Sequence, residues 1–294
     1  MRRARLQALG GLAVLAAAAG APAARAEGRL AVTFHPSRPP VGDMAWVHVR
    51  GGSEAATVEG AVAGRSLTFF RYGGGHAALV GIDLETRPET HRWQVAVLEP
   101  GTEPATVRGQ IRIGPRTFAV QRLTLPKGMV DLDPNTERRA LTEGERLRTL
   151  YRTLTPDRLW RGRFTRPVSG DEPGTGFGSR RIINGQPRAP HSGLDYAAAR
   201  GTPVVASNSG RVALVADYFF PGRLVVIDHG LGLYTLYFHL ESVSVTEDQH
   251  VDRGQPIGAV GATGRTTGPH LHFGVQVGAA RVDPAALFRL TVLD

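Results

Sequence analysis

The chain has 294 residues, 41% of them hydrophobic and 21% charged, so it is long enough to bury a core and suits about two domains. It has no cysteine, which excludes disulfides, a cysteine nucleophile and a lipid-modified cysteine, and leaves histidine and carboxylate to hold any metal. The formal charge of +9 comes almost entirely from arginine without a Lys/Arg cluster, so we predict no nucleic-acid partner.

Residues 1–26 have the pattern of a signal peptide. The basic start MRRAR precedes an apolar, alanine-rich run, and Ala24 and Ala26 form the A-x-A pattern of a cleavage site. A retained membrane anchor is the alternative, but the run is rich in small residues and no second hydrophobic span follows. We therefore expect an exported protein, periplasmic or secreted further, with no stable membrane span after cleavage.

Residues 27–126 are expected to form an immunoglobulin-like β-sandwich domain. Seven short segments rich in Val, Phe, Thr and Ile, the last at 116–125, alternate with Pro/Gly-rich turns at roughly ten-residue intervals, a pattern typical of an antiparallel sandwich. Histidines are scattered through this region, and we interpret each as structural or merely exposed: His35, His48, His76 and His91.

Residues 127–158 are expected to form a linker with one helix, because PNTERRALTEGERLRTLYRTL has a partial apolar stripe, with Asn135 or Thr136 as its cap. From about Trp160 the chain becomes glycine-rich, with short strand-like segments and no convincing long helical pattern. Residues 159–294 are therefore predicted to be a second, antiparallel β domain, which makes the fold class all-β.

The segment GPHLHFGVQV, residues 268–277, places His270 and His272 one residue apart. Alternate residues of a strand share a face, so the two histidines would lie opposite an apolar face. That apolar face consists of Leu271, Phe273, Val275 and Val277. A pair of core histidines is therefore disfavoured, while a pair of exposed histidines without a function remains an alternative.

A third histidine is found in the segment LYTLYFHL, residues 233–240. Strict alternation places His239 on the same face as Tyr237 and Thr235. The other face would consist of Tyr234, Leu236, Phe238 and Leu240. We therefore expect His239 to be held away from the apolar face of this strand.

His191 and Asp195 are four residues apart, a spacing that would align them on a helix as in H-E-x-x-H sites. Gly193 between them and the following RGTPV argue for an extended segment, in which both still share a face. We expect the bare Gly193 to leave room for an ion. His229 and His250 stand beside turn residues, and we interpret both as structural.

Together, these segments predict one shared metal site rather than a coincidence of weak patterns. Four of them resemble, in order, the motifs of the lysostaphin-type zinc metallopeptidases, the LytM family of peptidoglycan endopeptidases. The segments are HSGLDYAA, GTPVVASNSGRVALV, VVIDHGLGLYTLYFHL and VDRGQPIGAVGATGRTTGPHLHFGV. The resemblance covers nearly the whole second domain, and the first domain resembles that of some periplasmic members in architecture only.

The resemblance implies that His191, Asp195 and His272 are ligands of Zn²⁺, and that His270 and His239 flank the metal-bound water. We expect His270 to act as general base and His239 as oxyanion stabiliser or acid, although this division is not decided by the sequence. The implied activity is zinc-dependent hydrolysis of peptide cross-links in peptidoglycan, with a protein regulator as a further expected partner.

Two alternatives remain, a non-enzymatic wall-binding activator of another hydrolase and a secreted peptidase for glycine-rich proteins. Two glycine-rich stretches, 174–190 and 261–268, are expected to form loops at the mouth of a substrate groove. Arg180, Arg181 and Asn184 in the first stretch are candidates for substrate contact. The sequence does not distinguish glycine bridges from Ala–diaminopimelate cross-links as the substrate.

Overall fold

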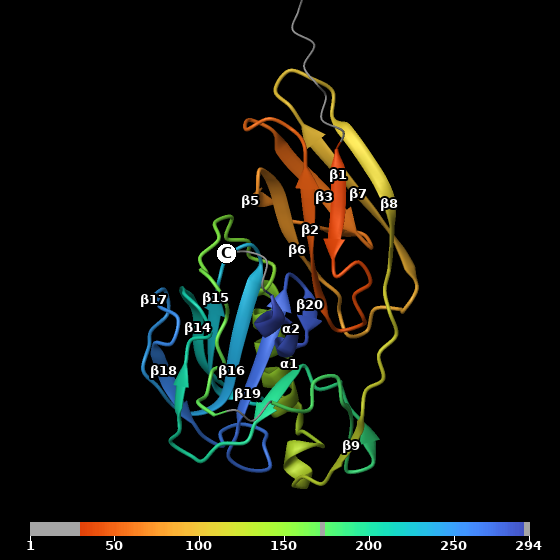
Figure 1. Cartoon of the computed structure of the whole chain (residues 1–294). Helices are drawn as coiled ribbons and strands as arrows, with labels where there is room; N and C mark the ends of the chain where they lie inside the picture. Colours follow the sequence, from red (N-terminus) through yellow and green to blue (C-terminus); the bar gives the residue numbers. More distant parts are fainter. Residues whose placement is uncertain (1–29, 171–173, 291–294) are drawn as a thin grey trace, which may run out of the picture.

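The structure, a computed structural model, describes residues 30–170 and 174–290, which form two β domains placed one above the other in Figure 1. The expected signal peptide, residues 1–26, lies outside the described residues. Nearly all regular structure is β, as expected, with a single long helix in the described ranges. No helix in these ranges is long and apolar enough to cross a membrane.

The first domain contains eight strands. They are β1 Ala31–His35, β2 Met44–Arg50, β3 Thr57–Val62, β4 Arg65–Ser66, β5 Phe70–Tyr72, β6 Gly75–Gly81, β7 Thr90–Leu98 and β8 Ala105–Arg112. They pair into two four-stranded antiparallel sheets, ordered β1-β2-β6-β5 and β4-β3-β7-β8. One hydrophobic core takes side chains from both sheets, including Val47 and Val80 from the first and Val95 and Val97 from the second.

The outer face of the first sheet is buried against the second domain. Alternate residues of β2 and β6 point away from the core of the first domain, and Trp46 and Leu79 among them join the main core of the second domain. Four ion pairs between described residues reinforce this contact, and in one of them the Arg281 guanidinium binds the Asp83 carboxylate at 2.9 and 3.1 Å. The main core of the second domain therefore extends to the outer face of the first sheet, while the first domain keeps its own core between its two sheets.

The second domain contains a nine-stranded sheet with β12-β19-β16-β15-β14-β17 as its main path. Its strands are β12 Gly193–Tyr196, β13 Pro203–Val205, β14 Gly210–Tyr218, β15 Gly222–Asp228, β16 Leu233–Val243, β17 His250–Val251, β18 Pro256–Val260, β19 Leu271–Val277 and β20 Ala280–Val282. A short helix, α2 (Pro284–Arg289), follows the last strand and packs on β19.

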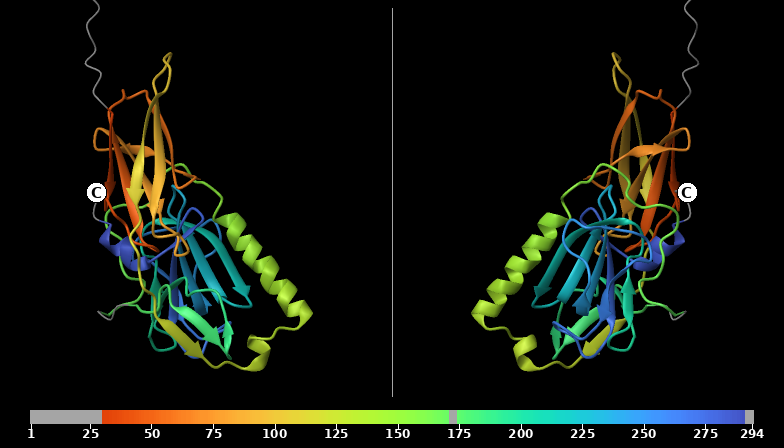
Figure 2. Two further views of the ribbon diagram at one scale, coloured as in Figure 1. Left: turned by 90° about the vertical axis from the view of Figure 1, so that its right-hand side faces the viewer. Right: turned by 90° about the vertical axis from the view of Figure 1, so that its left-hand side faces the viewer.

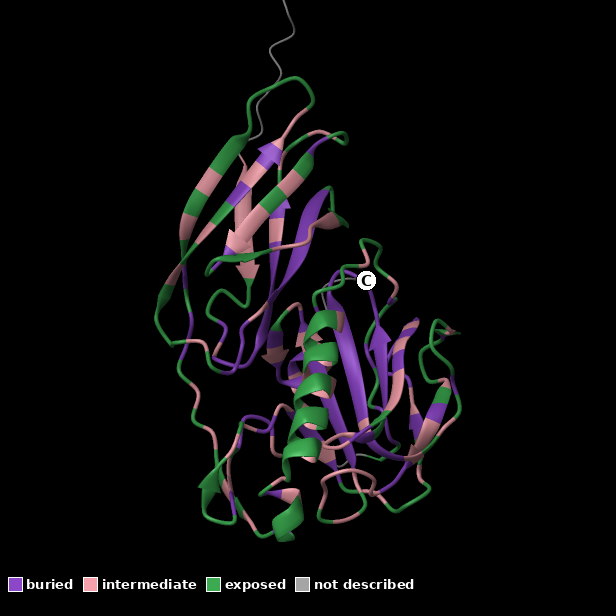
Figure 3. Ribbon diagram, turned by 180° about the vertical axis from the view of Figure 1, so that it is seen from behind, coloured by how far each residue is buried: buried purple, intermediate pink, exposed green. Residues whose placement is uncertain are grey.

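The expected helix of the connector forms as α1 (Pro134–Leu150) and lies along the second domain (Figure 2). Its cap is Asp133, not the expected Asn135 or Thr136, because the Asp133 carboxylate accepts hydrogen bonds from the backbone N–H groups of both. Figure 3 shows the outward side of α1 exposed over a buried sheet. The helix end and its neighbour Tyr151 cover Tyr234 and Leu236 of β16.

The segment between β8 and α1 runs alongside the second domain and pairs with it. There β9 (Val120–Leu123) pairs in parallel with β10 (Arg180–Ile183), which pairs with β11 (Gln186–Pro187). The short 3₁₀ helix η1 (Lys127–Met129) follows. The segment expected to end the first domain therefore belongs to a small sheet beside the second domain (Figure 1).

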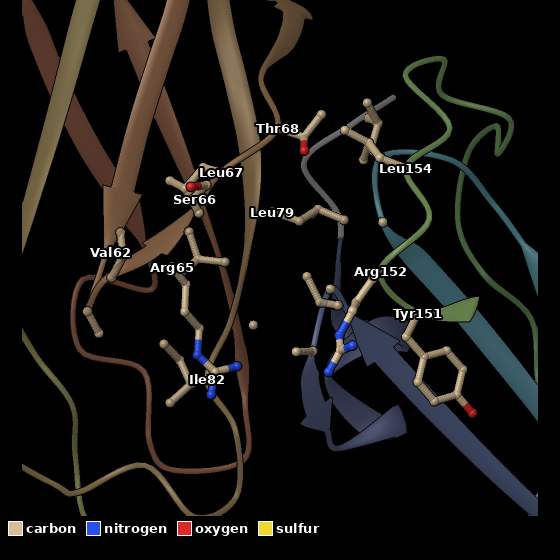
Figure 4. Close-up of a pocket in the computed structure, with 18 of the residues that line it drawn as sticks. Val62, Arg65, Ser66, Leu67, Thr68, Leu79, Ile82, Tyr151, Arg152 and Leu154 are labelled. Atoms are coloured by element: carbon tan, nitrogen blue, oxygen red, sulfur yellow. The ribbon is translucent and has the colours of Figure 1, made fainter. Parts of the chain in front are cut away.

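A cavity of about 360 Å³ lies where the two domains meet (Figure 4). Arg65 and Ile82 stand on the wall formed by the first domain, while Arg152 and Leu154 stand on the opposite wall. None of the described residues that line it is a histidine, so this cavity is separate from the predicted metal site.

Candidate metal centre and substrate groove

Two paired strands bring the three expected metal ligands together. In the antiparallel pair β12 and β19, Asp195 lies directly opposite His272, and Gly193 lies opposite Gly274. His191 lies two residues before the start of β12. The HxxxD segment is therefore extended, as its glycine predicted, and the strand register rather than a helical turn places the aspartate beside the second histidine.

The three side chains converge on one point. Nε2 of His191 lies 2.8 Å from Nδ1 of His272 and 2.9 Å from Oδ1 of Asp195, and the remaining side of this triangle measures 3.0 Å. Two imidazole nitrogens and one carboxylate oxygen are the donor set of three-ligand catalytic zinc sites, which leave a further position open. The geometry and the donor atoms thus fit a metal ion held by these residues.

The protonation of the cluster suits cation binding. Burial lowers the pKa of His272 to about 4, so its ring is neutral near pH 7 and offers a lone pair. Burial by itself would raise the pKa of Asp195, but hydrogen bonds with His191 and His272 outweigh this and hold the carboxylate well below its usual range. The cluster therefore contains an ionised carboxylate beside the neutral ring of His272.

Glycines make the space that the two histidine rings occupy. A Cβ on Gly193 would lie 2.7 Å from Nε2 of His272, and a Cβ on Gly176 would lie 2.7 Å from Nδ1 of His191. The bare position at Gly193, which the sequence suggested as room for an ion, is filled by the His272 ring. Gly193 therefore positions a ligand and does not form the ion cavity itself.

The β19 face prediction is confirmed, because Leu271, Phe273 and Val275 lie in the main core. His272 lies on the other face, buried beneath a stacked Phe238 ring at 5.2 Å between centroids. His270 precedes the strand and is half-buried, with Nδ1 2.8 Å from the carbonyl oxygen of Gly268. Its Nε2 lies 3.7 Å from Oδ1 of Asp195, at the edge of the cluster.

The face prediction for His239 is wrong, and a β-bulge is the reason. Tyr237 and Leu240 both lie in the main core, while Leu236 lies on the face covered by α1, so strict alternation would turn His239 into the core. One residue of β15 opposes both Phe238 and His239, and His239 has φ of +64°. The extra residue turns His239 towards His270, with 4.8 Å between ring centroids.

Hydrogen bonds fix the orientation of both flanking histidines. Nδ1 of His239 donates to the carbonyl oxygen of Thr263 at 2.8 Å, as Nδ1 of His270 does to Gly268. In the tautomer that donates from Nδ1, each ring has a lone pair on Nε2. Burial, with the nearby His272 and His270, lowers the pKa of His239 to about 3.

Three arginines also surround the site, and the sequence singled out only Arg181 among them. Its Nη2 donates to Oδ2 of Asp195 at 3.3 Å, and its Nε donates to the Gln121 side chain at 3.2 Å. Arg188 and Arg265 were missed, although both belong to the two glycine-rich loops. Of the other candidates, Arg180 is exposed and lines neither cavity described below.

Asn184 binds the backbone of the segment that follows β9. Its side chain accepts from the Leu125 backbone N–H at 3.0 Å and donates to the Leu125 carbonyl at 2.9 Å. His229 is fully buried and bonded to the Ser209 carbonyl and the Thr235 hydroxyl at 2.8 Å each, in keeping with a structural role. His250 is exposed on β17, away from the cluster.

The cluster opens into two adjoining cavities. The first, of about 70 Å³, has Asp195, His239, His270 and His272 on one side. Its other side is formed by the segment around β9, through Gln121, Leu123 and Leu125. The second, of about 200 Å³, reaches the cluster at His191, His239 and His272 and is also lined by arginines and aromatic rings. A β domain with this histidine and aspartate cluster at the base of a groove has the form of a hydrolytic metal site.

Comparison with known proteins agrees with that class. Residues 189–284 match the family model described as Peptidase family M23. A crystal structure of a candidate M23 peptidase from Pseudomonas aeruginosa is 31% identical, with a TM-score of 0.66, covering 85% of this chain and 95% of that chain. The chain therefore belongs to peptidase family M23.

Curated relatives match the second domain more closely. Peptidoglycan DD-endopeptidase ShyA of Vibrio cholerae is 39% identical over 131 residues, which is 44% of this chain and 28% of the relative. DD-carboxypeptidase/endopeptidase Mpg of Neisseria meningitidis is 43% identical over 97 residues, covering 33% of this chain and 22% of the relative. The matched region thus spans less than a third of either relative.

Proposed function

We propose that this protein is a zinc-dependent endopeptidase that hydrolyses peptide cross-links of bacterial peptidoglycan. The observation that carries the proposal is the convergence of His191, Asp195 and His272 on one point, with two further histidines directed at the same groove. Family membership and the names of the curated relatives support peptidoglycan as the substrate.

In this proposal the ligands of zinc are His191, Asp195 and His272. Zinc bound there supplies a Lewis acid that polarises the scissile carbonyl and lowers the pKa of water to about 7. Arg181 holds the second carboxylate oxygen of Asp195 and so fixes the orientation of that carboxylate.

The flanking histidines move the proton. The lone pair on Nε2 of His270 accepts the proton of the attacking water, and the resulting N–H donates it to the leaving amine. His239 has the same lone pair, but its buried ring resists gaining a proton, so we assign the proton transfer to His270. His239 then positions the attacking water by accepting one of its hydrogen bonds at Nε2, because its Nδ1–H is already donated to the Thr263 carbonyl oxygen.

The wider proposal concerns location and domain organisation. Residues 1–26 act as a signal peptide that exports the protein to the periplasm, where its substrate lies. The first domain, residues 27–126, is an immunoglobulin-like sandwich, residues 127–158 form the linker, and residues 159–294 form the peptidase domain. The two sheets around one core support the sandwich. A protein regulator would act on the segment around β9, which forms one wall of the groove.

Digestion of purified sacculi tests the activity and the bond together. The zinc-loaded mature protein is expected to release peptide fragments whose masses identify the cut, whereas His272→Ala loses both stoichiometric zinc and cleavage. Fragment profiles that stay unchanged across several wall chemistries, with zinc bound, would contradict the enzymatic proposal. Tight wall binding without any cleavage would instead support the alternative of a non-enzymatic activator.

A further inference from the structure

The groove beside the metal centre is strongly basic. Arg181, Arg188 and Arg265 all line the second cavity together with the histidines of the site. Among the described residues that line either cavity, Asp195 is the single acid, and the metal site already uses it. Three positively charged guanidinium groups therefore line the groove, and the described residues around it supply only one carboxylate to balance them.

Arg265 is held in place without a carboxylate. Its guanidinium lies 4.0 Å over the Phe220 ring, and its backbone N–H donates to the Phe220 carbonyl at 3.0 Å. No carboxylate of the described residues is within ion-pair distance of this side chain. Burial, together with Arg181 and Arg188, lowers the pKa of Arg265 to about 10, so the protein keeps this cation where charge is costly.

Arg188 is also held in place by neutral groups, but one of its hydrogen-bond donors lacks a partner. Its Nη2 donates to the Val130 carbonyl and the Gln186 side chain, which fixes the guanidinium plane. Its Nε is buried and has no hydrogen-bond partner in the described ranges. The hydrogen bonds of Nη2 hold the Arg188 guanidinium at the wall of the second cavity, and part of its donor capacity is not used by any described residue.

We propose that Arg188 and Arg265 form a carboxylate-binding subsite beside the metal centre, which selects peptides that carry a free carboxylate next to the scissile bond. This inference rests on the proposed function. Cross-links of the Ala–diaminopimelate type carry a free carboxylate on the diaminopimelate residue next to the scissile bond and a second one further away on glutamate, whereas a glycine bridge is neutral. Planar guanidinium groups recognise carboxylates by paired hydrogen bonds, which also fixes the register of the peptide in the groove.

The test uses purified cross-linked muropeptide dimers in three forms: unmodified, amidated at diaminopimelate, or amidated at glutamate. For the zinc-loaded full chain, kcat/KM is expected to be about 10- to 100-fold lower on one amidated form than on the unmodified dimer. Arg265→Gln and Arg188→Gln are each expected to lower kcat/KM on the unmodified dimer towards that level, with little further loss on the amidated form.

The controls separate charge recognition from general damage. Arg180→Gln, next to Arg181 but exposed and outside both cavities, is expected to leave all three rates unchanged. Arg265→Lys keeps the charge without the planar fork and is expected to fall between wild type and Arg265→Gln. Bound zinc in each variant is measured to show that the metal centre is intact.

Two results would overturn the proposal while leaving the enzyme assignment intact. One is a wild-type enzyme that cuts all three dimers at equal rates. The other is an arginine variant whose rate falls equally on the unmodified and amidated dimers. Failure of the zinc-loaded protein to cut any dimer or sacculus would instead remove the proposed function, and the subsite with it.

Discussion

Gly193 lies directly beneath the His272 ring, and its substitution tests how tightly the metal ligands are positioned. A Cβ there would lie 2.4 Å from the Phe273 carbonyl oxygen and 2.7 Å from the ring, so the ring has to move. We expect Gly193→Ala to weaken zinc binding about 10- to 100-fold, as loss of ligand orientation commonly does. Competition with a chromophoric chelator measures this affinity.

Gly128→Ala is the matched control, because a Cβ at that glycine meets nothing within 4 Å. The control is expected to bind zinc as the wild type does. Unchanged zinc affinity in Gly193→Ala, together with a normal unfolding curve, would show that the ring is not held by this close approach.

His229 makes the stability of the fold depend on pH. Burial lowers its pKa from 6.5 to about 4, so the folded state favours the neutral ring. The stability from this group is therefore complete above pH 6.5, and it is lost as pH falls from 6.5 towards 4, by about 1.4 kcal/mol per pH unit. Urea unfolding in the presence of a chelator, at pH 7 and pH 5, measures the loss.

The comparison with His229→Asn separates the effect of His229 from that of His272, whose pKa is also lowered by burial. Asn can keep one of the two hydrogen bonds of His229 but has no charge to gain. The variant is expected to be less stable at pH 7 and to lose less stability between pH 7 and pH 5 than the wild type. Equal losses in both proteins would contradict the assignment.

At the scale of elements, the loop after β18 orients the side chain of His239, which we propose to be catalytic. The Thr263 hydroxyl accepts from the Arg223 N–H at 3.0 Å and donates to the Leu240 carbonyl at 2.8 Å, while the Thr263 carbonyl accepts from His239. Thr263→Val keeps the volume and removes the hydroxyl. We expect kcat/KM to fall about tenfold with zinc content unchanged, because the loop loses its anchor but the ligands do not.

Steady-state kinetics on a muropeptide dimer, with zinc measured on the same sample, test this expectation. Thr263→Ser restores the hydroxyl and is expected to recover most of the activity. If Thr263→Val loses zinc as well, the loop supports the ligands directly and its role is different from the one described.

The elements that the sequence predicted well are those whose signal is local. Strand alternation identified the core face of β19, and the spacing of His191 and Asp195 with a glycine between them indicated an extended segment. The strand β3 was missed because its sequence, TVEGAV, is short and weakly hydrophobic. The bulge at His239 was also missed, since a period of two contains no mark of an inserted residue.

Contacts between residues far apart in the chain could not be predicted from local sequence patterns. The parallel pairing of β9 with β10 joins residues about sixty positions apart, and no sequence pattern records such a partner. The same limit applies to Arg188 and Arg265, which come from two loops and meet only in the folded groove. Their residue types were visible in the sequence, but their shared position was not.

At the scale of the whole molecule, the two domains behave as one packed body. Both faces of β6 are buried, Val80 in the core of the first domain and Leu79 in the core shared with the second. Gly81 approaches β20 so closely that a Cβ would lie 2.7 Å from the Cβ of Ala280. The length and composition of the chain suggested two domains but not their contact. The uninterrupted apolar run within β6 is typical of a strand that is buried on both faces.

This packing predicts that the domains unfold together. Val80→Ala removes buried methyl groups only from the core of the first domain, at a cost of about 2 kcal/mol. If unfolding is a single cooperative event, the slowest-exchanging amides of β16, in the second domain, lose protection by about 30-fold as well. Hydrogen exchange measured by NMR, with the chain intact and zinc bound, reports on both domains in one sample.

Leu154→Ala is the control, because Leu154 is half-exposed on a wall of the interdomain cavity, and it is expected to leave the protection of β16 unchanged. Loss of protection confined to the first domain in Val80→Ala would show that the shared core does not couple the two domains, and that the metal centre keeps its stability independently of the sheet packed against it.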